Sequence, residues 1–258
     1  MAFGGRIEAF MAVPTGITLS ATNGTGGPTL VTLTAGSYTA SSLVAHVVAA
    51  LNAQRPAGWT GSVSTGSSGT GRVTLAGTGT WSILWTSTAL RDALGFTANI
   101  SAVTYSQTGT ICARGLWMPD APIQIDSDPA RAPIVSDLRT TQSPTGKAYA
   151  MASNTFYRHK GLRWSHVPQA RVHEAKATYA GNTWETWFRQ TQIGGLVAWL
   201  SAGSAFEIYD HNEIKFGSDY SVASWQISPA INSIEPKRSS GDWVGYWEIA
   251  IPQIVSAG

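Results

Sequence analysis

The sequence contains little charge. Asp, Glu, Lys and Arg make up 12% of its 258 residues, about half of the share that is usual in soluble domains. The 17 basic and 15 acidic residues give a net charge of +2. Binding to nucleic acid through its phosphates needs a basic stripe on the surface. The charge balance therefore gives no support for nucleic acid as a specific partner.

The shortage of charge is concentrated in the first 112 residues. They contain six charged residues, whereas the remaining 146 residues contain 26. The six are Arg6, Glu8, Arg55, Arg72, Arg91 and Asp92. A soluble monomer usually has a charged surface of mixed sign, but this part can show solvent mainly Ser, Thr, Gly and Ala. Such a neutral surface tolerates close packing against other chains, which predicts a protein that works inside an assembly.

Cysteine and long apolar runs are also scarce. Cys112 is the only cysteine, which excludes an intrachain disulfide, and we expect it to be a small buried hydrophobic residue. The longest apolar runs, residues 43–51 and 196–200, are far shorter than the roughly 20 residues that span a membrane. The first residues lack the basic and apolar regions of a secretory signal. We therefore expect synthesis in a cytoplasm and no membrane insertion.

Motifs for catalysis and cofactor binding are missing as well. The sequence has no nucleophile elbow, no phosphate-binding loop and no dinucleotide-binding motif. Asp126 and Asp128 could bind a metal ion, but an Asx turn explains them more simply. Residues 210–213, Asp-His-Asn-Glu, fit a hairpin turn better than a metal site. We therefore expect no enzyme, no cofactor and no catalytic, cofactor-binding or metal-binding residue.

Two further residue types could suggest a binding site. His159, His166 and His173 recur every seven residues, but in strands this spacing puts successive members on opposite faces. The eleven Trp residues could stack on sugars. Core or subunit contacts explain them better, because Trp is enriched at both kinds of buried contact.

The pattern of the first half predicts short strands and two helices. Ser41 is a good N-cap for a helix over about residues 41–53, with His46 at its margin. Ser87 or Thr88 begins a second, short helix that ends at Gly95, with Phe96 packed back on it. Strands are expected at residues 17–19, 30–33, 59–65, 71–76, 81–85, 102–105 and 110–112.

The second half is predicted to contain more strands and one strong helix. The stiff, proline-containing residues 117–122 form a connector, and residues 126–147 form a long polar loop or arm. The helix begins at Asn182 or Thr183, has an aromatic face, and ends or kinks at the glycine pair 194–195. Strands are expected at residues 162–167, 170–179, 205–209, 222–227 and 243–251.

Two stretches carry a resemblance to viral structural proteins. Residues 30–112 resemble a small module of tailed-bacteriophage virion proteins through Tyr38-Thr39, Leu43, Leu51-Asn52, a β-hairpin, and Leu90 followed by Leu94-Gly95-Phe96. Residues 155–255 are similar in element order to the β-sandwich-plus-helix fold of phage tail-tube and distal-tail (baseplate hub) proteins. Residues 206–210 and the terminal strand at 246–251 are part of that pattern. The resemblance implies a ring-forming tail component without catalytic residues.

The expected fold is mainly β with a few helices, in two β-sandwich- or barrel-like domains that each carry one main amphipathic helix. Residues 1–113 form a low-charge interaction domain, residues 114–147 a linker and arm, and residues 148–258 the tail-tube-like domain. The expected function is structural, as a ring-forming tail or baseplate protein of a phage particle. Its partners are copies of itself and other virion proteins, and residues 126–147 and the N-terminal dozen are candidate clasps between subunits. The alternatives are a receptor-binding or head-decorating virion protein and, least favoured, a tail-associated hydrolase.

Overall fold

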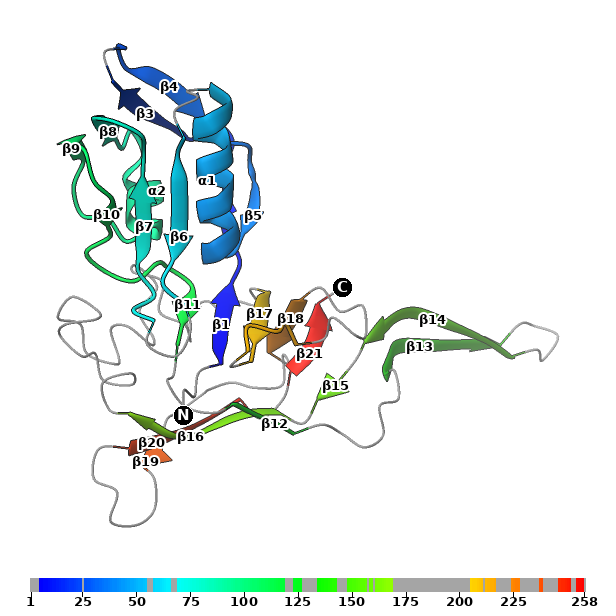
Figure 1. Cartoon of the computed structure of the whole chain (residues 1–258). Coiled ribbons are helices and arrows are strands. Elements are labelled where there is room, and N and C mark those ends of the chain that lie inside the picture. The colour runs from blue at the N-terminus through cyan, green and yellow to red at the C-terminus, as the bar shows by residue number, and fades with distance from the viewer. Residues whose placement is uncertain are drawn as a thin grey trace.

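The computed structural model shows a protein built mainly of strands, with two helices in the part of the chain that it describes (Figure 1). This confirms the prediction of a mainly β fold with few helices. The residues described are 5–24, 26–54, 58–65, 69–118, 123–126, 134–142, 148–156, 158–159, 161–168, 205–210, 212–216, 224–227, 237–238, 246–251 and 254–257. The predicted strand at 170–179 and the predicted helix after Asn182 lie outside them.

The first half folds around two antiparallel sheets and α1 (Figure 1). The four-stranded sheet has the order β4-β3-β8-β9, and the three-stranded sheet has the order β10-β7-β6. A third pair, β2 with β5, completes this part. The elements are β2 (Met11–Val13), β3 (Thr18–Asn23), β4 (Thr29–Thr32), β5 (Gly36–Tyr38), α1 (Ala40–Gln54), β6 (Thr60–Val63), β7 (Val73–Ala76), β8 (Trp81–Leu84), α2 (Thr88–Ala93), β9 (Ile100–Val103) and β10 (Gln107–Thr108).

The last strand of this half was predicted at residues 110–112, which is wrong. The structure has β10 at Gln107–Thr108 instead. Residues 111–113 bind loops rather than a strand partner: the amide of Ile111 donates to the carbonyl of Gly95, and the amide of Ala113 donates to the carbonyl of Gly71. The two acceptors lie in loops, Gly95 after α2 and Gly71 before β7, so residues 111–113 form no strand ladder.

α1 buries the apolar face that the sequence predicts. Leu43, Val44, Val47 and Leu51 are all at most 2% exposed. The cap is Thr39, however, and the prediction of Ser41 is wrong. The amide of Ser42 donates to Thr39 Oγ1 (3.3 Å), and the amide of Thr39 donates to Ser42 Oγ (2.8 Å). This reciprocal pair is a capping box shifted by two residues.

α2 has both predicted end signals. The amide of Leu90 donates to Ser87 Oγ at 3.2 Å, which makes Ser87 the N-cap. Gly95 follows the helix with a φ of +77°, a conformation that glycine adopts without strain. Phe96 is buried and stacks on Trp85, with ring centroids 5.4 Å apart.

We predict that Ser87→Ala lowers the free energy of unfolding by about 1 kcal/mol, because the amide at the start of α2 loses its acceptor. Urea unfolding of the variant and the parent measures this difference. Ser87→Asp is the matched variant, since it keeps an acceptor, and we expect it to recover most of the loss. An alanine variant as stable as the parent would show that the cap contributes nothing.

A six-stranded sheet joins segments from the whole length of the chain. Its order is β11-β1-β17-β18-β21-β15. Its strands are β1 (Arg6–Ala9), β11 (Leu116–Trp117), β15 (Arg158–His159), β17 (Phe206–Tyr209), β18 (Ser224–Ile227) and β21 (Ile254–Ala257). β1 therefore lies in one sheet with strands of the predicted third segment, 148–258.

The position of β1 changes one prediction. All four residues of β1 are buried, and the strand is antiparallel to both β11 and β17. β2, which follows it, pairs with β5. The N-terminal dozen residues were predicted as a clasp for a neighbouring subunit, which is wrong for residues 6–9, because both strand neighbours of β1 lie in the same chain.

In the rest of the second half, the structure describes a four-stranded sheet and a long hairpin. The sheet has the order β12-β16-β20-β19, with β12 (Ile123–Asp126), β16 (Gly161–Pro168), β19 (Lys237–Arg238) and β20 (Tyr246–Ile251). The hairpin pairs β13 (Ile134–Gln142) with β14 (Ala148–Phe156). Residues 126–147 were predicted as a long polar loop or arm, and the loop alternative is wrong for 134–142, because they form one strand of the hairpin. Within the described residues, no helix is long and apolar enough to cross a membrane.

Candidate interaction surfaces

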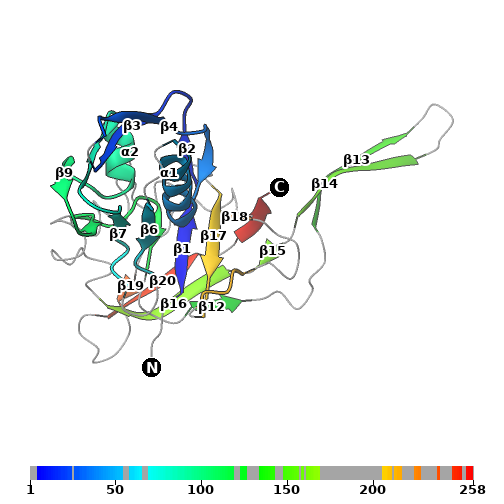
Figure 2. The same cartoon turned by 45° about the horizontal axis from the view of Figure 1, so that its top comes forward.

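The hairpin of β13 and β14 is the most prominent feature of the second half. Its two strands are nine residues long each and pair in register from Ile134↔Phe156 to Gln142↔Ala148. Figures 1 and 2 show it extending away from the other strands. Among the described strands, β13 and β14 pair only with each other. The hairpin, which we call the β-arm (residues 134–142 and 148–156), therefore presents two long strand edges.

The neutral surface of the first half is even poorer in free charge than the composition suggests. Arg6 is 7% exposed and Glu8 is 0% exposed, so neither contributes to the surface. Arg91 and Asp92 form an ion pair at 2.8 Å. Arg55 lies outside the described residues. Few isolated charges are therefore left to oppose contact with another protein.

Arg6 and Glu8 bind each other on one face of β1. Arg6 Nε donates to Glu8 Oε1 at 2.6 Å. Glu8 also accepts from the backbone amide (3.0 Å) and the hydroxyl (2.7 Å) of Ser41, in the first turn of α1. A carboxylate is favourable at this end of a helix, where backbone amides point outward and the helix dipole is positive. This cluster fixes the start of α1 on the six-stranded sheet.

The same arginine also binds the turn after β17. Arg6 donates to Glu213 Oε2 and lies over the ring of Tyr209, with Cζ 3.9 Å from the ring centroid. The Tyr209 hydroxyl donates to Glu207 Oε2 (2.6 Å), and Lys215 Nζ donates to Glu207 Oε1 (2.6 Å). Burial raises the pKa of Tyr209 well above its ordinary value, and the Glu207 carboxylate adds to the rise. Tyr209 is therefore a neutral donor, unsuited to act as a base.

Asp210 and residues 212–216 belong to a turn, as predicted for residues 210–213. Asp210 Oδ1 accepts from the amides of Asn212 and Ile214, both at 2.8 Å. Glu213 points to Arg6 instead. Within the described residues, no group of three or more His, Cys, Asp or Glu side chains is placed to hold a metal ion. The turn thus orients Glu213 toward β1.

The other residues weighed as sites are scattered. His46 is half-buried at the margin of α1, where Nε2 accepts from the amide of Thr34 (3.1 Å) and the ring stacks on Tyr38. His159 and His166 lie on β15 and β16, in different sheets, while His173 and Asp128 lie outside the described residues. Cys112 was expected to be buried and is half-buried.

The tryptophans that the structure describes with their side chains are core residues. They are Trp59, Trp81, Trp85, Trp117, Trp164 and Trp225, and each is at most 6% exposed. Trp117 and Trp164 meet edge to face with centroids 4.9 Å apart, which joins β11 to β16. None of these six rings is available to stack on a sugar from solvent.

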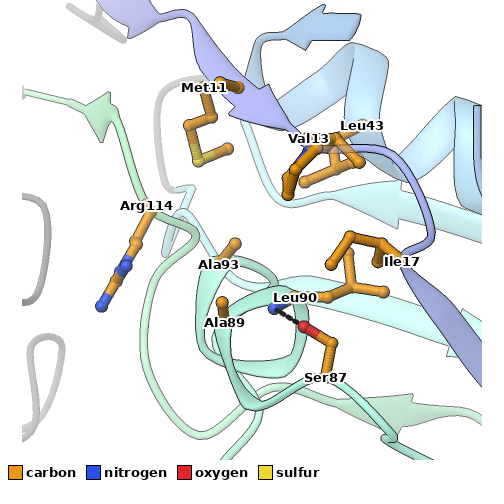
Figure 3. Close-up of a pocket in the computed structure, with 11 residues that line it drawn as sticks. Met11, Val13, Ile17, Leu43, Ser87, Ala89, Leu90, Ala93 and Arg114 are labelled. Atoms are coloured by element: carbon orange, nitrogen blue, oxygen red, sulfur yellow. Dashed lines mark hydrogen bonds between the residues drawn. The ribbon is translucent and has the colours of Figure 1, made fainter. Parts of the chain in front are cut away.

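A small, half-open pocket lies between β2, α1 and α2 (Figure 3). Its volume is about 140 Å³, and its lining is mostly apolar, with Met11, Val13, Ile17, Leu43 and Leu90. Arg114 is the charged residue of the lining, and it lies across the pocket from Leu43 and Ile17 (Figure 3). The Ser87 hydroxyl already accepts a hydrogen bond from the amide of Leu90 in α2. The pocket can admit an apolar group of side-chain size but offers no nucleophile or base.

Comparisons with known proteins assign no family to this chain: no family model matches it, and neither a curated protein nor a solved structure does.

Proposed function

We propose that the protein is a structural component of a tailed-bacteriophage particle, a ring-forming tail or baseplate protein whose subunits join by pairing strands. Under this proposal the chain has two β-sandwich-like domains and is located in the virion tail. It acts mechanically, without a cofactor, and its partners are copies of itself and other virion proteins. The observation that carries the proposal is the β-arm, with two nine-residue edges that the described strands leave unpaired.

The β-arm is suited to strand exchange for a physical reason. An unpaired strand edge presents amide and carbonyl groups that pair readily with a strand of another chain. Nine residues on each strand make this edge longer than β11 or β15, the two-residue strands at the ends of the six-stranded sheet. The low charge of the first half favours the same outcome, because little charge must be stripped of water when subunits pack.

Replacing residues 135–155 with a short Gly-Ser linker tests the role of the β-arm. We expect the full chain to form rings in negative-stain images and the deleted chain to lose the ring contact. The matched control replaces only residues 143–147, which connect the two strands in sequence, and should keep the rings. Circular dichroism and the unfolding midpoint check that the deleted chain is folded. Rings that survive the deletion would contradict strand exchange through the β-arm.

A second experiment tests the place of the protein in a particle. Peptides of this chain should be found by mass spectrometry in purified phage particles, and antibodies to it should label their tails. Labelling of the head alone would favour a head-decorating protein. Inhibition of cell adsorption by the recombinant chain would favour receptor binding. Absence from the particles would overturn the proposal.

A further inference from the structure

The four-stranded sheet of the first half has two very different faces. Inward side chains, including Leu19, Ala21 and Ile83, are fully buried. The outward side chains alternate with them along β3, β4 and β8. They are Thr18, Ser20, Thr22, Leu30, Thr32, Ser82 and Leu84, which we call the outer face. No member of the outer face is charged.

Two leucines stand out on the outer face. Leu30 is 59% exposed and Leu84 is 52% exposed. Both lie directly opposite Ser20 in register, one on each neighbouring strand. Since strands are about 4.8 Å apart, the leucines are about 10 Å apart with the small serine between them. Across these three strands, Leu30 and Leu84 therefore project on either side of a shallow depression at Ser20.

One edge of this sheet, that of β4, is partly covered by side chains of α1. The amide of Thr32 donates to Gln54 Oε1 and its carbonyl accepts from Gln54 Nε2, both at 3.0 Å. The next outward amide, that of Thr34, donates to His46 Nε2. Side chains of α1 thus bind the free edge of β4, in the way that edge strands are commonly protected. A partner strand therefore cannot add along Thr32 and Thr34, whereas the outer face keeps two exposed leucines.

We propose that the outer face packs against the outer face of a second copy of the chain, about a two-fold axis. The chemistry of the face selects this partner. Hydroxyl groups can both donate and accept hydrogen bonds. Thr18 and Ser82 already bond to Thr86 and Ala102 within the chain, and a copy of the same face offers matching partners to the other hydroxyls. A leucine of one copy fits the depression at Ser20 of the other. A charged partner would bury its charges without compensation, which is costly.

The two-fold contact differs in geometry from the proposed ring contact. A ring forms when one surface binds a different surface of the next subunit, whereas a two-fold contact joins identical surfaces. If the β-arm forms rings, the outer face pairs two rings back to back. If it does not, the outer face still forms dimers. The inference therefore goes beyond the proposed function and can stand without it.

The test compares particle masses of three variants by mass photometry at physiological salt. Leu30→Glu/Leu84→Glu should halve the mass of the full chain, because like charges then face each other across the axis. The matched control is Ile214→Glu, which adds a charge at a residue that is 59% exposed in the turn after β17 and should leave the mass unchanged. In the arm-deleted chain, the same double substitution should convert dimers to monomers.

A mixing experiment adds a readout that misfolding cannot imitate. Leu84→Lys alone should also halve the mass, and mixing it with Leu84→Glu should restore the parent mass at low salt. Loss of rings only on arm deletion, with no effect of the leucine substitutions on mass, would overturn the outer-face contact while leaving the ring intact. Halving by the leucine substitutions with no effect of arm deletion would support the outer face and contradict the proposed ring contact.

Discussion

Glu8→Ala is expected to lower the free energy of unfolding by about 3–5 kcal/mol, the cost of removing one partner of a buried ion pair. Glu8 is fully buried, and its carboxylate accepts from Arg6 and from the amide and hydroxyl of Ser41. Its loss leaves the amide of Ser41 without that acceptor and removes the fully buried anion from Arg6. Urea or thermal unfolding of the full chain, followed by tryptophan fluorescence, measures the effect.

Glu213→Gln is the matched control for Glu8→Ala. Glu213 binds the same arginine, but its side chain is 42% exposed, so water can replace its carboxylate. Ion pairs with this much solvent contact contribute about 0–1 kcal/mol, and we expect a loss in that range. Equal losses for the two variants would contradict the account of Glu8 as the anchor between β1 and α1.

Gly95→Ala is the second substitution with a large expected effect, a loss of about 2–5 kcal/mol. A side chain at a φ of +77° costs about 1–2 kcal/mol. In addition, a Cβ at this position would overlap the carbonyl oxygen of Ile111 and lie 3.1 Å from that of Cys112. Both obstacles are backbone atoms, so the segment that closes the first half must shift, which adds about 1–3 kcal/mol.

Gly16→Ala separates the two contributions. Gly16 has nearly the same φ, +79°, but no atom lies within 4 Å of a Cβ added there. We expect this variant to lose only the conformational part, about 1–2 kcal/mol. The unfolding midpoints of both variants in urea give the comparison. A Gly95 variant no less stable than the Gly16 variant would show that residues 111–112 do not constrain the turn.

Local signals predicted the elements of the first half well. The apolar spacing of α1 and the serine and glycine at the ends of α2 correspond to real contacts. Periodicity and caps depend on neighbours in sequence, which one chain displays directly. Ser41 was predicted as the cap of α1, but Thr39 takes that position. The hydroxyl of Ser41 instead donates to Glu8, a residue 33 positions away in the sequence.

The pairing of strands that are far apart in the chain could not be predicted from the sequence. Nothing near Arg6 indicates that β1 pairs with β17, some 200 residues later. One signal was present, however: Arg6 and Glu8 are two residues apart in a segment otherwise almost free of charge, and this spacing puts both on one face of a strand. The β-arm was missed because polar residues in a two-stranded hairpin do not need the alternating pattern of a sheet with a buried face.

The most direct test of the account is the mass distribution of the full chain in solution, by mass photometry with negative-stain images of the same sample. If the β-arm closes rings and the outer face pairs them about a two-fold axis, the particles are closed and contain a single, even number of subunits. We also expect that the number changes little with added salt, because few charges lie at the contacts. Finding only monomers at every concentration at which the protein is soluble would contradict the account.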